Sequence, residues 1–277
     1  MTEFEHIIVD NPAEGVSRIT LNRPDSRNAL NNILRGEIYA TLEKNDNDHD
    51  VKVTILRGAG KAFCAGYDLK ANSRQNQPFH TSGGDGNWPR HVVDGFFRVW
   101  DLAKPVIAQV HGYCLAGGTE LATSCDLVYV AEDAKIGYPV VRSMSPPDNQ
   151  FFPHIMGLRR AMEMMLTGDA ISGIEAVEYG FANRAYPAEG LDAAVIEIAE
   201  RIAQVPTDLQ QMNKRAVHRQ LELMGMRAAI RSGTEIQALA FHTKSTQAHF
   251  KELAAGLTDA LSKRDEKFGD YRTKEDH

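Results

Sequence analysis

The segment at residues 105–130 constrains the fold more than any other part of the chain: it reads PVIAQVHGYCLAGGTELATSCDLVYV. Pro105 opens an apolar run that is typical of a strand buried on both faces. Two adjacent glycines, a short helical stretch and a second apolar strand follow. Because buried strands that alternate with helices are typical of layered α/β domains, the segment predicts an α/β fold.

The same alternation extends through the chain to about residue 186. The predicted strands are residues 6–9, 16–22 and 50–58, and the predicted helices are residues 33–45 and 91–103. Asn28 or Asn31 is expected to cap the first of these helices. Residues 72–90 are polar and rich in Gly, Ser and Asn, so we expect them to form a loop over a site.

The pattern becomes almost entirely helical from about residue 190. Near the end, five apolar side chains recur at offsets of three, four, four and seven, as on one face of a helix: Phe250, Leu253, Leu257, Leu261 and Phe268. Such a face packs either on the chain's own core or in a subunit interface. We therefore divide the chain into an α/β core at residues 1–189 and a helical region at residues 190–277.

Charge and cysteine content exclude several classes of function. The net charge is −6, and the chain has no block of Lys or Arg, so neither nucleic acid nor a membrane surface is an expected partner. The three cysteines form no C-x-x-C pair, which argues against a zinc site or a disulfide framework and for a reducing compartment. The first residues do not resemble a signal peptide. We predict a cytoplasmic protein without a metal.

The glycine pair, Gly117 and Gly118, indicates a site where a ligand approaches the backbone. Glycine allows this close approach, and the first N–H groups of a helix starting here have no partner within the helix. An oxygen that gains negative charge would be stabilised by such a donor. Glu120 lies on the first turn, where a carboxylate can move a proton. Alternatively, Glu120 only complements the helix dipole.

A second glycine loop, residues 61–70 (KAFCAGYDLK), also follows a buried strand and exposes N–H groups at Gly66 and Tyr67. Two separate loops that each supply one backbone donor are what an oxyanion hole requires. Neither loop has the spacing of a P-loop, and no G-x-S-x-G motif indicates a serine hydrolase.

Four segments together resemble the crotonase (enoyl-CoA hydratase/isomerase) superfamily: NRPDSRNAL, AFCAGYDLK, GYCLAGGTELATSCDLVYVAEDAKIG and MLTGDAISGIEAVEYGFANRAY. The resemblance implies a spiral of ββα units followed by a helical C-terminal region that forms trimers, often paired into hexamers. It also implies an acyl-CoA thioester substrate, with CoA entering as part of that substrate rather than as a cofactor. By motif position, the oxyanion hole consists of the Tyr67 and Gly117 amides.

The resemblance also assigns residues to substrate and CoA binding: Arg27, Ala65, Tyr67, Asp68, Leu69, Lys70 and Gly117. Arg27 would contact the nucleotide end. Asp68 is also expected to hold its own loop in place. Trp88 and Phe79 either cap the acyl pocket or are exposed loop aromatics. His111, Cys64 and Cys114 are interpreted as structural residues.

One position departs from the family pattern. Hydratases of this family use two glutamates; Glu120 matches the first, and Val140 stands at the position of the second. A valine cannot transfer a proton, so two-carboxylate hydration is in doubt. Asp148, eight residues on, resembles a catalytic aspartate of the dienoyl-CoA isomerase branch; alternatively, it caps the next helix. Tyr138 either supplies a phenol to the site or is a packed core residue.

The sequence therefore predicts an acyl-CoA-processing enzyme of the enoyl-CoA hydratase/isomerase type, with Glu120 and Asp148 as catalytic residues. Enoyl- or dienoyl-CoA isomerisation and C–C hydrolysis of a cyclic diketo-acyl-CoA remain open. A different class, a non-catalytic CoA- or RNA-binding homologue, also remains. The acidic charge argues against RNA, and the retained Gly117, Gly118 and Glu120 argue against loss of catalysis.

Overall fold

The computed structural model describes residues 4–269 and 271, and its strands form two sheets. The larger sheet has the order β1-β2-β3-β5-β7-β9, and the smaller has the order β4-β6-β8. The strands are β1 (Ile7–Ala13), β2 (Val16–Leu21), β3 (Val53–Gly58), β4 (Ala62–Cys64), β5 (Val106–Val110), β6 (Tyr113–Leu115), β7 (Leu127–Ala131), β8 (Lys135–Gly137) and β9 (Arg184–Tyr186). Only β1 and β2 pair antiparallel; every other pair of neighbours is parallel.

Three successive units wind through both sheets. In each unit, a strand of the larger sheet leads into a strand of the smaller sheet and then into a helix. These helices are α2 (Asn87–Trp100), α3 (Gly117–Ser124) and α4 (Phe152–Thr167). The arrangement confirms the predicted α/β spiral of ββα units. Because β5 is buried along its whole length, the apolar run behind Pro105 belongs to the centre of the molecule.

The first helix, α1 (Asn32–Asn47), begins at Asn31, whose side-chain oxygen accepts a hydrogen bond from the Leu34 N–H at 2.8 Å. Asn28 has a different role. Its side-chain amide donates to the backbone oxygens of Ala59 and Ala62, at 2.9 and 2.8 Å. Asn28 thereby ties the 3₁₀ turn at Pro24–Ser26 to the loop before β4.

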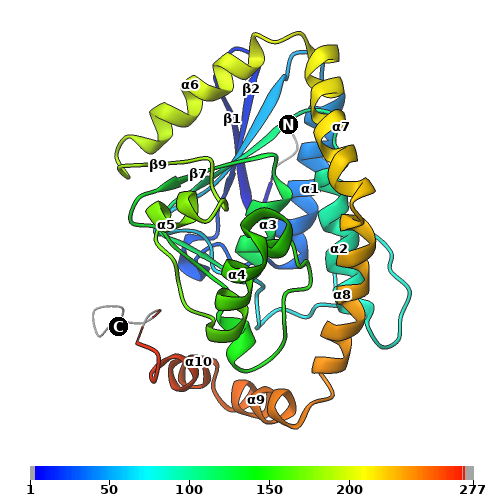
Figure 1. The fold of residues 1–277 in the computed structure, drawn as a ribbon, viewed down its shortest axis with the longest axis vertical. Coiled ribbons are helices and arrows are strands. Elements are labelled where there is room, and N and C mark those ends of the chain that lie inside the picture. Colours follow the sequence, from blue (N-terminus) through cyan, green and yellow to red (C-terminus); the bar gives the residue numbers. More distant parts are fainter. Residues whose placement is uncertain (1–3, 270, 272–277) are drawn as a thin grey trace.

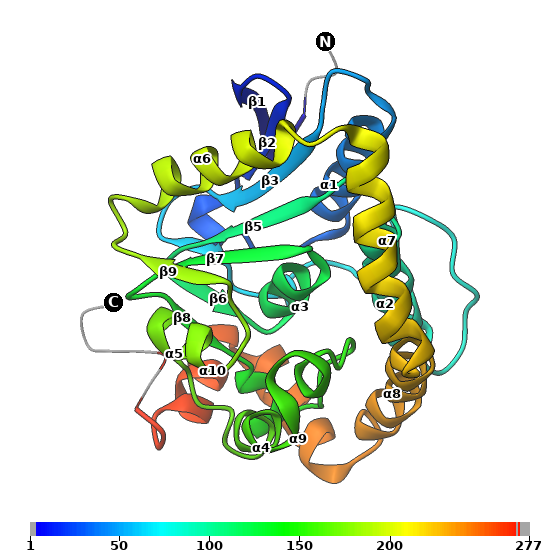
Figure 2. The same cartoon turned by 45° about the horizontal axis from the view of Figure 1, so that its top comes forward.

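The polar stretch predicted as a loop at residues 72–90 ends earlier than expected, because α2 starts at Asn87. The helices after the core are α5 (Gly173–Glu178), α6 (Leu191–Ala203), α7 (Thr207–Leu223), α8 (Met226–Ala240), α9 (Lys244–Ala255) and α10 (Leu257–Asp265). Figure 2 shows α6 lying along the larger sheet, while α7 and α8 run beside α1 and α2.

The prediction of one helix carrying the apolar face from Phe250 to Phe268 is wrong. The chain breaks at Gly256, whose extended backbone (φ 178°, ψ 108°) separates α9 from α10. Glycine has a low helix propensity, so tertiary packing can interrupt the helix at this position. Both helices lie next to α4 (Figure 1), and the Thr246 hydroxyl donates to the Met144 carbonyl at 2.6 Å. This hydrogen bond attaches α9 to the segment before α4. None of the five apolar side chains belongs to the hydrophobic core of the described residues, so their packing in a subunit interface stays a prediction.

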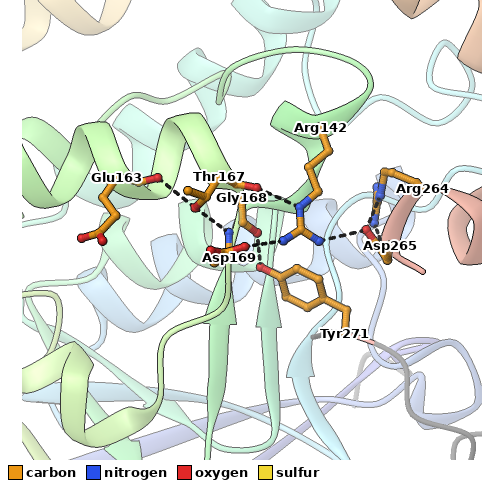
Figure 3. Close-up of polar contacts among 8 residues, drawn as sticks. All are labelled: Arg142, Glu163, Thr167, Gly168, Asp169, Arg264, Asp265 and Tyr271. Atoms are coloured by element: carbon orange, nitrogen blue, oxygen red, sulfur yellow. Dashed lines mark hydrogen bonds and ion pairs between the residues drawn. The ribbon is translucent and has the colours of Figure 1, made fainter. Parts of the chain in front are cut away.

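An ionic cluster around the buried side chains of Arg142 and Asp265 attaches α10 to the core (Figure 3). The Arg142 guanidinium donates to the Thr167 carbonyl at 2.9 Å, to Asp169 at 2.8 Å and to Asp265 at 3.3 Å. Arg264 also binds Asp265, at 2.7 Å. We refer to Arg142, Asp169, Arg264 and Asp265 as the closing cluster.

Within residues 4–269 and 271, none of the helices has both the length and the apolar character needed to span a bilayer.

Candidate active site

The two glycine loops predicted to form one site do lie in contact. A side chain at Gly66 (φ 107°) would come within 2.9 Å of the Ala116 Cβ and 3.4 Å of the Gly117 nitrogen. A side chain at Gly118 would lie only 2.3 Å from the Cys64 carbonyl oxygen. Glycine is therefore required on both sides, because the two backbones approach more closely than any side chain allows.

In each loop, the N–H group expected to serve the oxyanion hole has no acceptor among the described residues. The amides of Asp68 and Ala116 are used, donating to Leu30 at 3.1 Å and to Gly137 at 3.0 Å. Within the described part of the chain, the amides of Tyr67 and Gly117 have no such acceptor. Ala116, directly before α3, has φ +50° and ψ −121°, a backbone conformation that is strained for an alanine. Strain of this kind is concentrated at functional sites.

Glu120 is buried, with an exposed fraction of 1%, and its carboxylate accepts four hydrogen bonds. The Tyr67 and Tyr138 hydroxyls donate at 2.7 and 2.8 Å. The Asp148 backbone N–H donates at 3.0 Å and the Asn149 side-chain amide at 3.4 Å. The side chain therefore does not merely complement the helix dipole. It gathers donors from the β4 loop, from Tyr138 and from the segment before α4.

Asp148 caps no helix, so that alternative is wrong: α4 starts after Phe151, without a side-chain cap. The Asp148 carboxyl is buried, and its Oδ1 has no hydrogen-bond partner among the described residues. Burial, followed by the negative charge of Glu120, raises the pKa of Asp148 well above its usual range. The Glu120 pKa is also raised by burial, but the two phenols oppose that shift. The four donors favour the ionised form of Glu120, whereas the raised pKa favours the protonated form of Asp148.

Val140 lies in the 3₁₀ turn at Pro139–Arg142, half-buried against the core. It contributes no acid or base. The second carboxyl group beside Glu120 is therefore Asp148. Tyr138 fits both predicted alternatives: its hydroxyl donates to Glu120 at 2.8 Å, and its ring is buried in the core.

Glu120 and Gly117 line one cavity, together with an arginine that the sequence analysis missed. Other residues of the wall are Leu30, Ile38, Tyr39, Tyr67 and Leu121. The arginine is Arg35 of α1, whose exposed fraction is 2%. A signal was present in the sequence: Arg35, Ile38 and Leu42 are spaced as i, i+3 and i+7, so the arginine shares the face that α1 buries.

Of the residues assigned to CoA binding, Tyr67 and Gly117 line the cavity, and the others do not: Arg27, Ala65, Asp68, Leu69 and Lys70. Ala65 donates its N–H to the Arg27 carbonyl at 3.0 Å, and the Arg27 guanidinium lies 5.1 Å from the Tyr113 ring centre. Asp68 holds its own loop, as expected, since it accepts from Arg23 at 2.9 Å and from the Lys70 N–H at 3.0 Å.

Leu69 and Lys70 are exposed at the loop surface. Trp88 belongs to α2 and not to a loop, and its ring packs edge-on against Tyr67 at 5.1 Å. Phe79 instead packs against His91, with ring centres 4.4 Å apart. Both aromatic residues considered for the acyl pocket contact the cavity wall: Trp88 packs on Tyr67, and the Phe79 ring centre lies 6.1 Å from that of Tyr39.

His111 and the cysteines have structural surroundings. The His111 Nε2 lies 2.9 Å from the Gly60 carbonyl. Burial raises the pKa of the Cys64 thiol to about 12 and that of Cys114 well above its usual range. Neither thiol is ionised at neutral pH, so neither is an active nucleophile.

Comparisons with known proteins agree with this geometry. Residues 11–271 match the family model described as enoyl-CoA hydratase/isomerase. The mitochondrial enoyl-CoA hydratase of Pongo abelii is 32% identical over 276 residues, which is 96% of this chain and 89% of that protein. An enoyl-CoA hydratase from Mycobacterium smegmatis has a TM-score of 0.88 at 33% identity, covering 98% of this chain and 97% of its own. An enoyl-CoA hydratase/isomerase from Xanthobacter autotrophicus Py2 has a TM-score of 0.86 at 36% identity, covering 96% and 99%.

Proposed function

Because this chain belongs to the enoyl-CoA hydratase/isomerase family, we propose that it moves a double bond within an unsaturated acyl-CoA thioester. The observation that carries this proposal is the pair of buried carboxyl groups, Glu120 and Asp148, beside two backbone N–H groups without an acceptor among the described residues. In the proposal, Glu120 is the base and Asp148 the acid. A neighbouring base and acid can remove a proton at one carbon and deliver a proton at another.

The reaction begins with the thioester oxygen between the Tyr67 and Gly117 N–H groups. Glu120 removes a proton from the α carbon, and the electron pair moves onto the thioester oxygen, where the two amides stabilise the negative charge. As the electrons return, Asp148 protonates the γ carbon, and the double bond shifts to the α,β position. One proton is taken and one is given, so transfer of the proton from Glu120 to Asp148 restores the starting state.

Hydration of a 2-enoyl-CoA is the second candidate, because the relatives named above are described as enoyl-CoA hydratases. It is less well supported here, since Val140 replaces the carboxylate that would act on the added water. A general acid or base contributes roughly 10²–10⁴-fold to rate. Hydration by Glu120 alone would therefore be slow.

The remaining assignments are part of the same proposal. The CoA portion runs along Ala65, Tyr67, Asp68, Leu69 and Lys70, with Arg27 at the nucleotide end. The helical region at residues 190–277 contributes to a trimer or hexamer, which light scattering of the purified protein would test.

Initial rates with a 3-enoyl-CoA, a 3,5-dienoyl-CoA and crotonyl-CoA test the reaction type. We expect isomerisation of one of the first two substrates to exceed crotonyl-CoA hydration, and we expect Glu120→Gln and Asp148→Asn to abolish it. Asp133→Asn, at an exposed carboxylate, is the matched control and should have no effect. Rapid crotonyl-CoA hydration that requires Glu120 but not Asp148 would refute the role of Asp148. Acyl-CoA binding in calorimetry without turnover of any of the three substrates would favour the non-catalytic CoA-binding homologue, and absence of acyl-CoA binding would refute the proposed substrate class.

A further inference from the structure

Two opposite charges line the cavity without touching one another. The Glu120 carboxylate and the Arg35 guanidinium both contribute to its wall. Tyr67 lies between them: its hydroxyl donates to Glu120 at 2.7 Å, and its ring centre lies 6.0 Å from the Arg35 Cζ. The charges are therefore separated by an aromatic ring rather than joined in an ion pair.

Arg35 is a buried cation whose hydrogen-bond acceptors are neutral groups. It donates to the Asn32 side-chain oxygen at 3.0 Å and, over 3.5 Å, to the His91 carbonyl. The rings of Tyr39, Tyr67 and Trp88 surround it at 5.5–6.0 Å. Within residues 4–269 and 271 it forms no ion pair with a carboxylate. A guanidinium has five donors, so these acceptors leave part of its capacity unused.

Such an arrangement is costly if it serves only the fold. A buried ion loses several kcal/mol of hydration, and cation–π contacts recover about 0.5–2 kcal/mol each. Ile38 and Leu42 are the next buried residues on this face of α1, and both are apolar. The fold therefore does not require a charged side chain on this face. A charged group retained on a cavity wall therefore indicates recognition of a ligand.

The ionisable groups that interact with the Arg35 charge include one carboxyl, Asp148. Burial, followed by the Glu120 charge, raises the Asp148 pKa, which favours its neutral form. Burial followed by the Arg35 charge lowers the His91 pKa to about 4, so His91 is neutral at pH 7. Burial likewise raises the Tyr67 pKa well above its usual range, so that phenol is neutral as well. Arg35 is thus the one full positive charge among the residues of this cavity wall.

We propose that Arg35 binds a second oxygen acceptor on the acyl group, so that the substrates are acyl-CoA thioesters whose acyl chain carries a carboxylate or ketone beyond the β carbon. This inference rests on the proposed function, since it requires the acyl group to enter the cavity lined by Gly117, Glu120 and Arg35. The guanidinium fork suits either acceptor, because it presents two parallel donors to a carboxylate and one to a ketone.

Calorimetric binding of three unreactive five-carbon thioesters tests the inference without requiring turnover. The probes are pentanoyl-CoA, 4-oxopentanoyl-CoA and glutaryl-CoA, which end in a methyl group, a ketone and a carboxylate. We expect at least one of the two oxygenated probes to bind roughly 10- to 100-fold more tightly than pentanoyl-CoA, which is the range of a charge-assisted hydrogen bond. Which of the two binds more tightly then identifies the acceptor.

Arg35→Met should remove this preference while leaving pentanoyl-CoA binding within about twofold, and Arg35→Lys should retain part of it. The matched control is Arg98→Met, since Arg98 also stacks on a ring, Phe79, at 4.6 Å but lies outside the cavity wall. Thermal unfolding of each variant verifies that it is folded.

Equal binding of all three probes by the wild type, or a preference that survives in Arg35→Met, would overturn the inference while leaving the proposed function intact. If none of the three thioesters bound at millimolar concentration, the proposed function would fail first, and the inference with it.

Discussion

Two buried arginines in this molecule have opposite surroundings. Arg142, in the closing cluster, has a side chain only 2% exposed, and it contacts two carboxylates, Asp169 and Asp265 (Figure 3). Arg35 is equally buried but contacts no carboxylate, and it faces a cavity instead. The first arginine joins two parts of the chain, whereas the second has donors left for a ligand.

The same contrast applies to the carboxyls. Asp265 is 3% exposed and receives hydrogen bonds from Arg142 and Arg264. Asp148 is equally buried, but its Oδ1 has no partner among the described residues. Removing either partner of a paired buried charge is strongly destabilising. Burial instead raises the pKa of Asp148, which favours its neutral form, since no cation within residues 4–269 and 271 pairs with its carboxyl group. The contrast thus separates groups that hold the fold from groups that serve the site.

The largest expected effect is on catalysis at Glu120. Glu120→Gln keeps the shape of the side chain but removes the charge, so it should lower kcat by about 10²–10⁴-fold. Steady-state rates with the preferred acyl-CoA measure this change. The corresponding change in the closing cluster, Asp265→Asn, should leave kcat within about twofold in the folded protein. If Asp265→Asn lowered kcat as far as Glu120→Gln does, the closing cluster would contribute to catalysis, and the contrast with the active site would be wrong.

The next effect is on stability in the closing cluster. Arg142→Met leaves the buried Asp265 without one of its two cations, and breaking a buried pair costs about 3–5 kcal/mol. Urea unfolding at pH 7 measures this loss of unfolding free energy. The double variant Arg142→Met, Asp265→Leu should recover part of it, because neither charge then remains. A single variant as stable as the wild type would show that these charges do not hold α10 in place.

The third prediction concerns pH. An unfolded aspartate loses its proton near pH 3.8, whereas the raised pKa keeps Asp148 protonated in the folded protein to higher pH. The folded state therefore binds more protons in that window, and the free energy of unfolding falls as pH rises through it. Asp148→Asn cannot titrate, so it should show a shallower decline than the wild type.

Denaturant unfolding between pH 4.5 and 8 compares the two proteins, with Asp133→Asn as a control that should follow the wild type. Parallel pH profiles of the wild type and Asp148→Asn would mean that Asp148 is ionised in the folded state.

The smallest effect is expected at Arg35. Arg35→Met removes a buried charge that has no ionic partner, so the free energy of unfolding should change by no more than about 1 kcal/mol, or increase. Urea unfolding compares it directly with Arg142→Met. A loss at Arg35 as large as that at Arg142 would assign both arginines to the fold and weaken the case for ligand recognition.

Much of the site was predictable because its residues are close in sequence. Gly117, Gly118 and Glu120 share one turn, and the loop at residues 61–70 has the same strand–glycine pattern. Local sequence does not reveal which donors meet Glu120. Tyr67, Tyr138 and Asn149 come from three separate segments, and their convergence depends on how β4, β6 and β8 align.

The errors have equally specific causes. The apolar residues from Phe250 to Phe268 keep a helical spacing across Gly256, so the sequence pattern predicts a single helix. Hydrophobic periodicity alone does not show where the backbone leaves the helical conformation. Arg35 was missed because an arginine on a helix usually faces solvent, and only the burial of α1 against α2 and α3 shows that this one does not.

The sequence by itself determined the α/β class, the family and the two glycine loops, since strand burial, helix starts and close backbone approach depend on residues that are neighbours in the chain. Tertiary structure decided which of the charged groups are paired. The energy of a buried charge depends on partners from distant segments, and Asp265 meets Arg142 across 123 positions while Arg35 meets no carboxylate. For that reason only the folded molecule separates Arg142, which closes the structure, from Arg35, which faces the cavity.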